Sequence, residues 1–108
     1  MSYYVGRRTK MGPIVTVDGE PLEDRLDLRN HSPTGFEWGF SGSGPAQLAL
    51  AILADHCDGN EEALDLYQRF KWAVVAQLPR IGWSLNTRQI DEAIDRIRAE
   101  ESPNGGRK

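Results

Sequence analysis

Hydrophobic residues are densest in the run from Ala46 to Ala54, which only Gln47 interrupts. A helix that is apolar on nearly every side lies inside a fold, so this pattern predicts a central, buried helix. Proline suits the first helical position, and an Asp-Gly pair commonly ends a helix. We therefore expect the helix to begin at Gly44 or Pro45 and to end near Cys57.

Two more helices are predicted where apolar residues recur at helical spacing. The first of them has Asn60 as its cap and runs to about Leu78. The other starts at a capping box made by Asn86 and Gln89 and continues to the end of the ordered chain. The connector between these two helices is expected to place Trp83 in the core.

Strands are predicted where aromatic and β-branched residues cluster or alternate with other residues. Residues 3–8 and 14–17 indicate a β-hairpin, and a third short strand can follow the turn at residues 18–19. Alternating aromatic residues predict a further strand over residues 36–40. The expected fold class is α+β, with a small antiparallel sheet packed on about three α-helices. Residues 1–99 would form a single domain, and residues 100–108 a disordered tail.

Composition and charge narrow the class of protein. The chain has 108 residues, of which 39% are hydrophobic and 27% charged, as is typical of one soluble, globular domain. A net charge of −3 argues against broad nucleic-acid binding, which needs many cationic contacts to phosphates. No apolar run is long enough to cross a membrane, and no signal peptide is visible. A single cysteine fits a cytoplasmic location.

The glycine-rich turn before the central helix is the main candidate site. Backbone N–H groups and the positive end of the helix dipole favour an anion there, such as phosphate or carboxylate. Further contacts could come from Ser41, Gly42, Ser43, Gly44 and Gln47. The turn lacks both the ending of a nucleotide-triphosphate loop and the spacing of a dinucleotide fingerprint. A tight strand-to-helix turn without any ligand is an equal alternative.

Charged and aromatic residues complete this candidate site. Arg7 and Arg8 can supply positive charge, although such residues more commonly solubilise an edge strand. Trp38 or Phe40 can form an apolar wall, and Trp38 is also a core candidate. Glu37 could act as an acid or base if its pKa were raised, or it could face solvent or pair with an arginine. Catalysis is not favoured, because no second catalytic group accompanies it.

A row of metal-capable side chains occurs at the end of the central helix, at Asp55, His56, Cys57 and Asp58. Adjacent residues on a helix point in different directions, so they cannot easily converge on one ion. His31 is the only other histidine. We expect no metal and no other cofactor, with Cys57 as a small core or helix-end residue.

Trp72 follows Lys71 on a helix whose apolar face is already supplied by other residues. An indole in that position is predicted to be exposed, as a contact for a partner or for a second copy of the chain.

The stretch from Gly35 to Leu53 reads GFEWGFSGSGPAQLALAIL. It resembles a family of short proteins known only as a domain of unknown function, with members in bacteria, archaea, phages and other mobile elements. The similarity extends from Tyr3 to about Ile94. The resemblance implies no catalytic residue. It implies a protein that binds something, including host-defence components or their nucleotide signals.

These observations together predict a non-enzymatic binding protein of a mobile element or its host. Its ligand would be small and anionic, a class that includes nucleotide-derived molecules, and would lie at the turn from Ser41 to Gly44. The alternative is a protein–protein inhibitor or adaptor that acts on a host defence complex. A hydrolase centred on Glu37 is a third and less favoured hypothesis.

Overall fold

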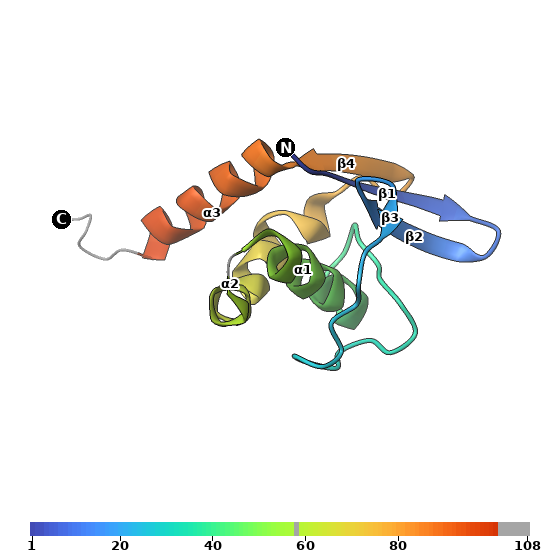
Figure 1. Ribbon diagram of the computed structural model, residues 1–108, viewed down its shortest axis with the longest axis horizontal. Coiled ribbons are helices and arrows are strands. Elements are labelled where there is room, and N and C mark those ends of the chain that lie inside the picture. The colour runs from blue at the N-terminus through green and yellow to red at the C-terminus, as the bar shows by residue number, and fades with distance from the viewer. Residues whose placement is uncertain (58, 102–108) are drawn as a thin grey trace.

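The structure, a computed structural model, describes residues 1–57 and 59–101 (Figure 1). Its elements are, in chain order, β1 (Tyr3–Thr9), β2 (Gly12–Val17), β3 (Glu20–Pro21), α1 (Ser43–His56), α2 (Asn60–Ala73), the 3-10 helix η1 (Val75–Gln77), β4 (Gly82–Asn86) and α3 (Thr87–Glu101). The strands form one antiparallel sheet in the order β3-β2-β1-β4. The predicted α+β class, with a small antiparallel sheet and three α-helices, is confirmed.

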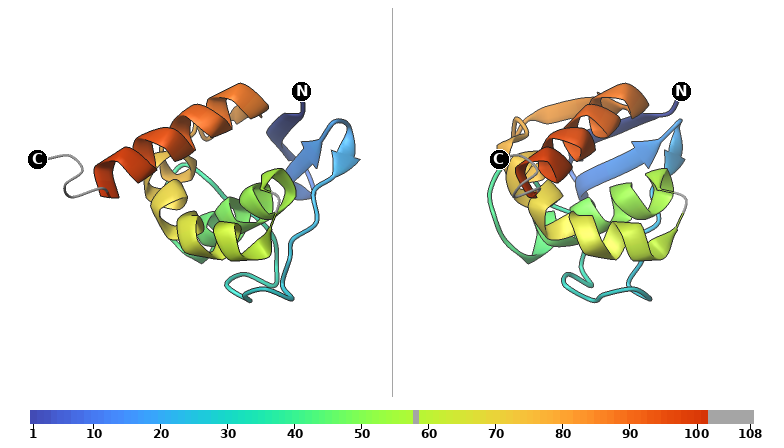
Figure 2. Two further views of the ribbon diagram at one scale, coloured as in Figure 1. Left: turned by 60° about the vertical axis from the view of Figure 1, so that its left-hand side comes forward. Right: turned by 90° about the vertical axis from the view of Figure 1, so that its left-hand side faces the viewer.

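The helices α1 and α2 lie on one side of the sheet. Figure 1 shows α1 and α2 below the sheet, while α3 continues from the end of β4, and Figure 2 shows the same layers from two other directions. Side chains along β1 alternate accordingly, since Tyr4 and Gly6 are buried whereas Tyr3 and Val5 are exposed. No helix of the described chain covers the opposite face of the sheet.

The helix α1 forms the centre of the core. Every residue from Gly44 to Leu53 is buried, so the helix has no solvent-facing side over this range. It packs against α2 on one side and lies beneath the sheet on the other. The prediction of a central, buried first helix is therefore confirmed.

The predicted strand over residues 36–40 is wrong. This segment pairs with no strand in the described chain, and the N–H of Gly39 instead donates to the carbonyl oxygen of Val75 at 3.0 Å. Gly35 and Gly39 have φ angles of +132° and +85°, which a β-strand does not contain. The alternating aromatic residues therefore belong to an irregular loop, which buries Trp38 completely.

The fourth strand of the sheet is β4, a segment predicted to be a connector. Its Trp83 stands opposite Gly6 of β1, and the indole fills the space that a side chain at Gly6 would need. A Cβ atom at Gly6 would lie 2.3 Å from the Trp83 ring, so this close pairing requires glycine. Trp83 is buried, as predicted.

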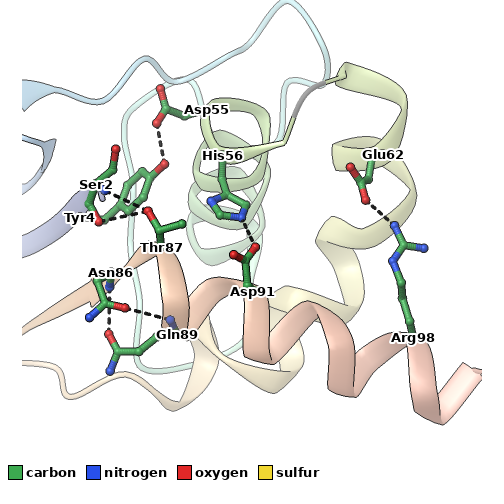
Figure 3. Close-up of polar contacts among 10 residues, drawn as sticks. All are labelled: Ser2, Tyr4, Asp55, His56, Glu62, Asn86, Thr87, Gln89, Asp91 and Arg98. Carbon is green, nitrogen blue, oxygen red and sulfur yellow. Dashed lines mark hydrogen bonds and ion pairs between the residues drawn. The ribbon is translucent and has the colours of Figure 1, made fainter.

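The start of α3 follows the predicted capping box (Figure 3). The N–H of Gln89 donates to Oδ1 of Asn86 at 2.9 Å, and the N–H of Asn86 donates to Oε1 of Gln89 at 2.8 Å. Both contacts satisfy N–H groups at the helix start that have no partner inside the helix. This prediction is confirmed.

Several helix boundaries differ from those predicted. Asn60 is the first residue of α2 and Gly59 is its cap, and α2 ends at Ala73 before η1 begins. Because α3 continues to Glu101, it includes the first two residues of the predicted tail. Residues 102–108, the rest of that predicted tail, lie outside the described residues. Within the described chain, no helix is both long and apolar enough to cross a membrane.

Candidate functional site

The helix α1 begins without a side-chain cap. Gly42 precedes it in an extended conformation, and the N–H of Ala46 donates to the carbonyl oxygen of Gly42 at 3.0 Å. Pro45 has no N–H, so the donors of Ser43 and Gly44 are those that the helix itself leaves unpaired. The first turn contains no acidic residue of its own.

The turn itself is open and shallow. Ser41 and Ser43 are exposed, whereas Gly44 is buried beneath Glu37, so that a Cβ at Gly44 would lie 2.7 Å from Cβ of Glu37. None of the three clefts at His56, Trp72 and Leu22 is lined by a residue from 41 to 44. The turn can therefore offer donors to an anionic group at the surface, without enclosing a whole ligand.

Arg8 and Glu37 form a bidentate ion pair beside this turn. Nη2 of Arg8 lies 2.9 Å from Oε1 of Glu37, and Nη1 of Arg8 lies 3.2 Å from Oε2. The Arg8 guanidinium holds the pKa of Glu37 below its usual value, although partial burial opposes this effect. Glu37 is therefore an arginine partner, which is one of the predicted alternatives, and it is ionised at neutral pH rather than poised as an acid.

Trp38 belongs to the core. It has no exposed surface, and its indole N–H donates to the carbonyl oxygen of Arg80 at 3.1 Å. Its ring meets Trp83 edge to face at a centroid distance of 5.7 Å, and the Arg8 guanidinium lies 4.6 Å from its centroid. A side chain enclosed in this way supports the site from below and cannot form the wall of a ligand pocket.

The amide of Gln47 is used entirely within the protein. Its oxygen accepts from the N–H groups of His31 and Ser32 at 2.8 and 3.1 Å. Its nitrogen donates to the carbonyl oxygens of Asp24 and Arg29 at 2.7 and 3.0 Å. Gln47 is fully buried, so these four contacts fasten the long loop onto α1 and leave no hydrogen-bonding capacity for a ligand.

Arg7 lies apart from the other predicted site residues. Side chains of neighbouring residues on a strand point to opposite faces of the sheet. Because Arg8 points toward Glu37, on the side of the helices, Arg7 points to the face that no helix of the described chain covers. The structure therefore does not bring Arg7 together with the turn before α1.

Arg80 is the site residue that sequence reasoning missed. Its aliphatic stem packs where a side chain at Gly39 would lie, and its guanidinium carbon is 5.6 Å from the centroid of the Phe40 ring. Phe40 in turn packs against Gly42, within the turn itself. No carboxylate of the described chain lies within ion-pair distance of Arg80. Arg80 follows the turn by some 40 positions in the sequence, so no local pattern associates it with the turn.

A second cluster of polar side chains joins α3 to the other helices (Figure 3). Nε2 of His56 lies 2.7 Å from Oδ1 of Asp91, and Nη2 of Arg98 lies 2.5 Å from Oε2 of Glu62. The cleft between these pairs measures about 450 Å³ and is lined by His56, Cys57, Glu62, Asp91, Ile94, Asp95 and Arg98. The two pairs connect α3 to the end of α1 and to the first turn of α2.

The metal-capable side chains of residues 55–57, from the row noted at residues 55–58, do not converge on one point. Asp55 accepts from the hydroxyl of Tyr4, and His56 faces Asp91 (Figure 3). Burial, with the Glu62 carboxylate, raises the pKa of Cys57 to about 11, so its thiol is protonated at neutral pH. Asp58 lies outside the described residues. Among the described residues, no three His, Cys, Asp or Glu side chains are placed to hold a metal ion.

Comparison with known protein families matches residues 4–96 to a family of unknown function, DUF6166. Searches of the curated proteins and of the solved structures found no match. The family match spans nearly the whole described chain, from the first residues of β1 into α3. This chain therefore belongs to the DUF6166 family of unknown function.

Proposed function

We propose that this chain is a non-enzymatic binding protein that takes an anionic group at the start of α1. The observation that carries the proposal is the uncapped N-terminus of α1 beside Arg80, a cation that forms no ion pair in the described chain, although the Glu37 carboxylate lies close enough to feel its charge. The N–H group of Ser43 and the exposed hydroxyls of Ser41 and Ser43 supply donors. The ligand would be a phosphate-bearing small molecule, including a nucleotide.

The charges around the turn favour an anion over a cation. Arg8 and Glu37 neutralise each other, so Arg80 leaves the local cluster with a net positive charge. Helix dipole and guanidinium act in the same direction on a bound phosphate. Phe40, which is 41% exposed, offers an aromatic surface for the rest of the ligand.

Isothermal titration calorimetry with inorganic phosphate, AMP and a cyclic dinucleotide tests this proposal. We expect at least one of these anions to bind. Arg80→Gln should weaken binding about tenfold or more, because a charge-assisted hydrogen bond contributes roughly 1.5–3 kcal/mol. Ser43→Asp should abolish binding through charge repulsion, while the fold gains slightly from an acid in the first helical turn.

Arg7→Gln is the matched control, because it removes the same charge from the opposite face of the sheet. It should leave the affinity unchanged. Absence of binding to every anion, or an equal loss in Arg7→Gln and Arg80→Gln, would contradict the proposal.

A protein partner is the second candidate, and the shallowness of the turn favours it. None of the three clefts at His56, Trp72 and Leu22 is lined by residues 41–44, and Phe40 with Arg80 forms an exposed aromatic–arginine pair of the kind common at interface centres. In this case the chain would be an adaptor or inhibitor of a host complex, including a defence complex of a cell that carries the mobile element. A stoichiometric partner retained by Ser43→Arg but lost in Phe40→Ala would support this alternative.

A further inference from the structure

Trp72 lies at the surface beside an apolar groove. The groove measures about 460 Å³, runs between α2 and α3, and is lined by Arg69, Trp72, Ala73, Ile97 and Glu100. Ile97 is buried at its base, whereas Trp72 is 59% exposed. We call this set of residues the Trp72 groove. An exposed tryptophan beside an apolar groove has the composition of an interface centre.

Other exposed apolar side chains lack such a setting. Met11 and Ile81 are more exposed than Trp72, but they lie in turns and line none of the three clefts. The ammonium of Lys71 lies 4.8 Å from the Trp72 ring centroid, a cation–π contact that favours one orientation of the indole. The Trp72 indole is therefore oriented by Lys71 beside the groove, whereas Met11 and Ile81 lie in turns.

The two walls of the Trp72 groove carry opposite charges. The α2 wall carries Arg69, with Lys71 close by, and the α3 wall carries Glu100. Arg69 is engaged on α2 itself, since Nη2 donates to the carbonyl oxygen of Asp65 at 2.8 Å and lies 3.7 Å from its Oδ2. Lys71 adds a second positive charge, so the α2 wall keeps a net positive charge. A two-fold axis at this face would set the cationic α2 wall of one copy against the anionic α3 wall of the other, twice over.

We propose that a second copy of this chain binds at the Trp72 groove and forms a two-fold symmetric dimer. The exposed Trp72 side chain, the groove and both charges lie on a single face, as a two-fold symmetric contact requires. In Figure 1 the C-terminal part of α3 extends past the other elements of the described chain. Trp72 of each copy enters the groove of the other. None of the residues in the proposed anion site takes part.

Sedimentation velocity of the full chain, without ligand and from micromolar to millimolar concentration, tests this proposal. The mass of wild type should rise with concentration from 12.1 kDa toward twice that value. Trp72→Glu should remain at 12.1 kDa throughout, and Trp72→Ala should shift dimerisation to at least tenfold higher concentration. Because Trp72 is exposed, circular dichroism should show unchanged folding in both variants.

Ile81→Glu is the matched control, since it places the same charge on an even more exposed apolar residue away from the groove. It should dimerise as wild type does. Glu100→Lys should weaken the dimer, because it sets like charges against each other across the two-fold axis. A wild type that stays monomeric at all concentrations, a dimer that survives Trp72→Glu, or an equal loss in Ile81→Glu would overturn the proposal.

Discussion

Whether a side chain can serve a ligand depends first on whether it already has a partner. Arg8 and Glu37 form a bidentate ion pair with each other. The Gln47 amide makes its hydrogen bonds with backbone groups of the loop. Arg80 contacts the Phe40 ring and forms no ion pair in the described chain, although its charge also acts on Glu37. The available positive charge beside α1 therefore comes from Arg80, and not from either arginine that the sequence suggested.

The Arg8–Glu37 pair makes stability depend on pH. Because the pKa of Glu37 is lowered in the fold, the pair stabilises the fold fully above the ordinary glutamate value of 4.5. That stabilisation is lost as the pH falls through the lowered value. Glu37→Gln should therefore unfold at lower urea concentration than wild type at neutral pH. The difference between their urea midpoints should become smaller at acidic pH.

Urea midpoints of both proteins at pH about 7 and about 3 measure this effect. Glu20→Gln serves as the control, because Glu20 is exposed and forms no ion pair among the described residues. A gap between wild type and Glu37→Gln that stays constant over this pH range would show that the ion pair is not the cause.

At the scale of elements, α1 organises a loop that has little regular structure of its own. The loop between β3 and α1 is held largely by Gln47, whose four hydrogen bonds replace the ladder that a strand would provide. The same loop delivers Phe40 and Gly42 to the start of α1. Ordering of this loop is therefore a condition for the proposed anion site.

Replacing Gln47 with leucine should loosen this loop. The change leaves buried N–H and C=O groups without partners, at a cost of about 2 kcal/mol or more in the free energy of unfolding. Amide hydrogen exchange should accelerate at His31 and Ser32 in particular, which donate to Gln47. Gln68→Leu, at an exposed position on α2, should leave exchange at these amides unchanged. Equal exchange rates at His31 and Ser32 in all three proteins would refute this role of Gln47.

Local patterns predicted the elements that local physics determines. The apolar run gave α1, the Asn86–Gln89 spacing gave the start of α3, and the turn at residues 18–19 led to β3. Strand partners are a non-local property, and here prediction failed. β4 pairs with β1, which lies near the other end of the chain, and the pairing depends on Gly6 making room for Trp83.

The candidate site was predicted in part. Its position before α1 and its neighbour Glu37 followed from the sequence, because they are adjacent along the chain. Which arginine lies near the turn before α1 could not be predicted. It depends on the sheet face on which Arg7 lies and on the approach of Arg80 to Gly39 and Phe40. Exposure of Trp72 was correctly predicted from its place on a helix with another apolar face.

At the scale of the whole molecule, the fold is asymmetric. Helices cover one side of the sheet, and the proposed anion site and the Trp72 groove use different residues of that helical side. The proposed positive site, on a chain of net charge −3, would direct an anion to one place instead of attracting polyanions generally. Dimerisation through the Trp72 groove would give the assembly two such sites.

Titration of ¹⁵N-labelled protein with inorganic phosphate, followed by amide resonances, is the most direct test of the anion site. The account predicts saturable shifts centred on Ser43 and Gly44 that disappear in Arg80→Gln and persist in Arg7→Gln. Shifts absent from Ser43 and Gly44 at saturating phosphate, or unchanged in Arg80→Gln, would contradict it.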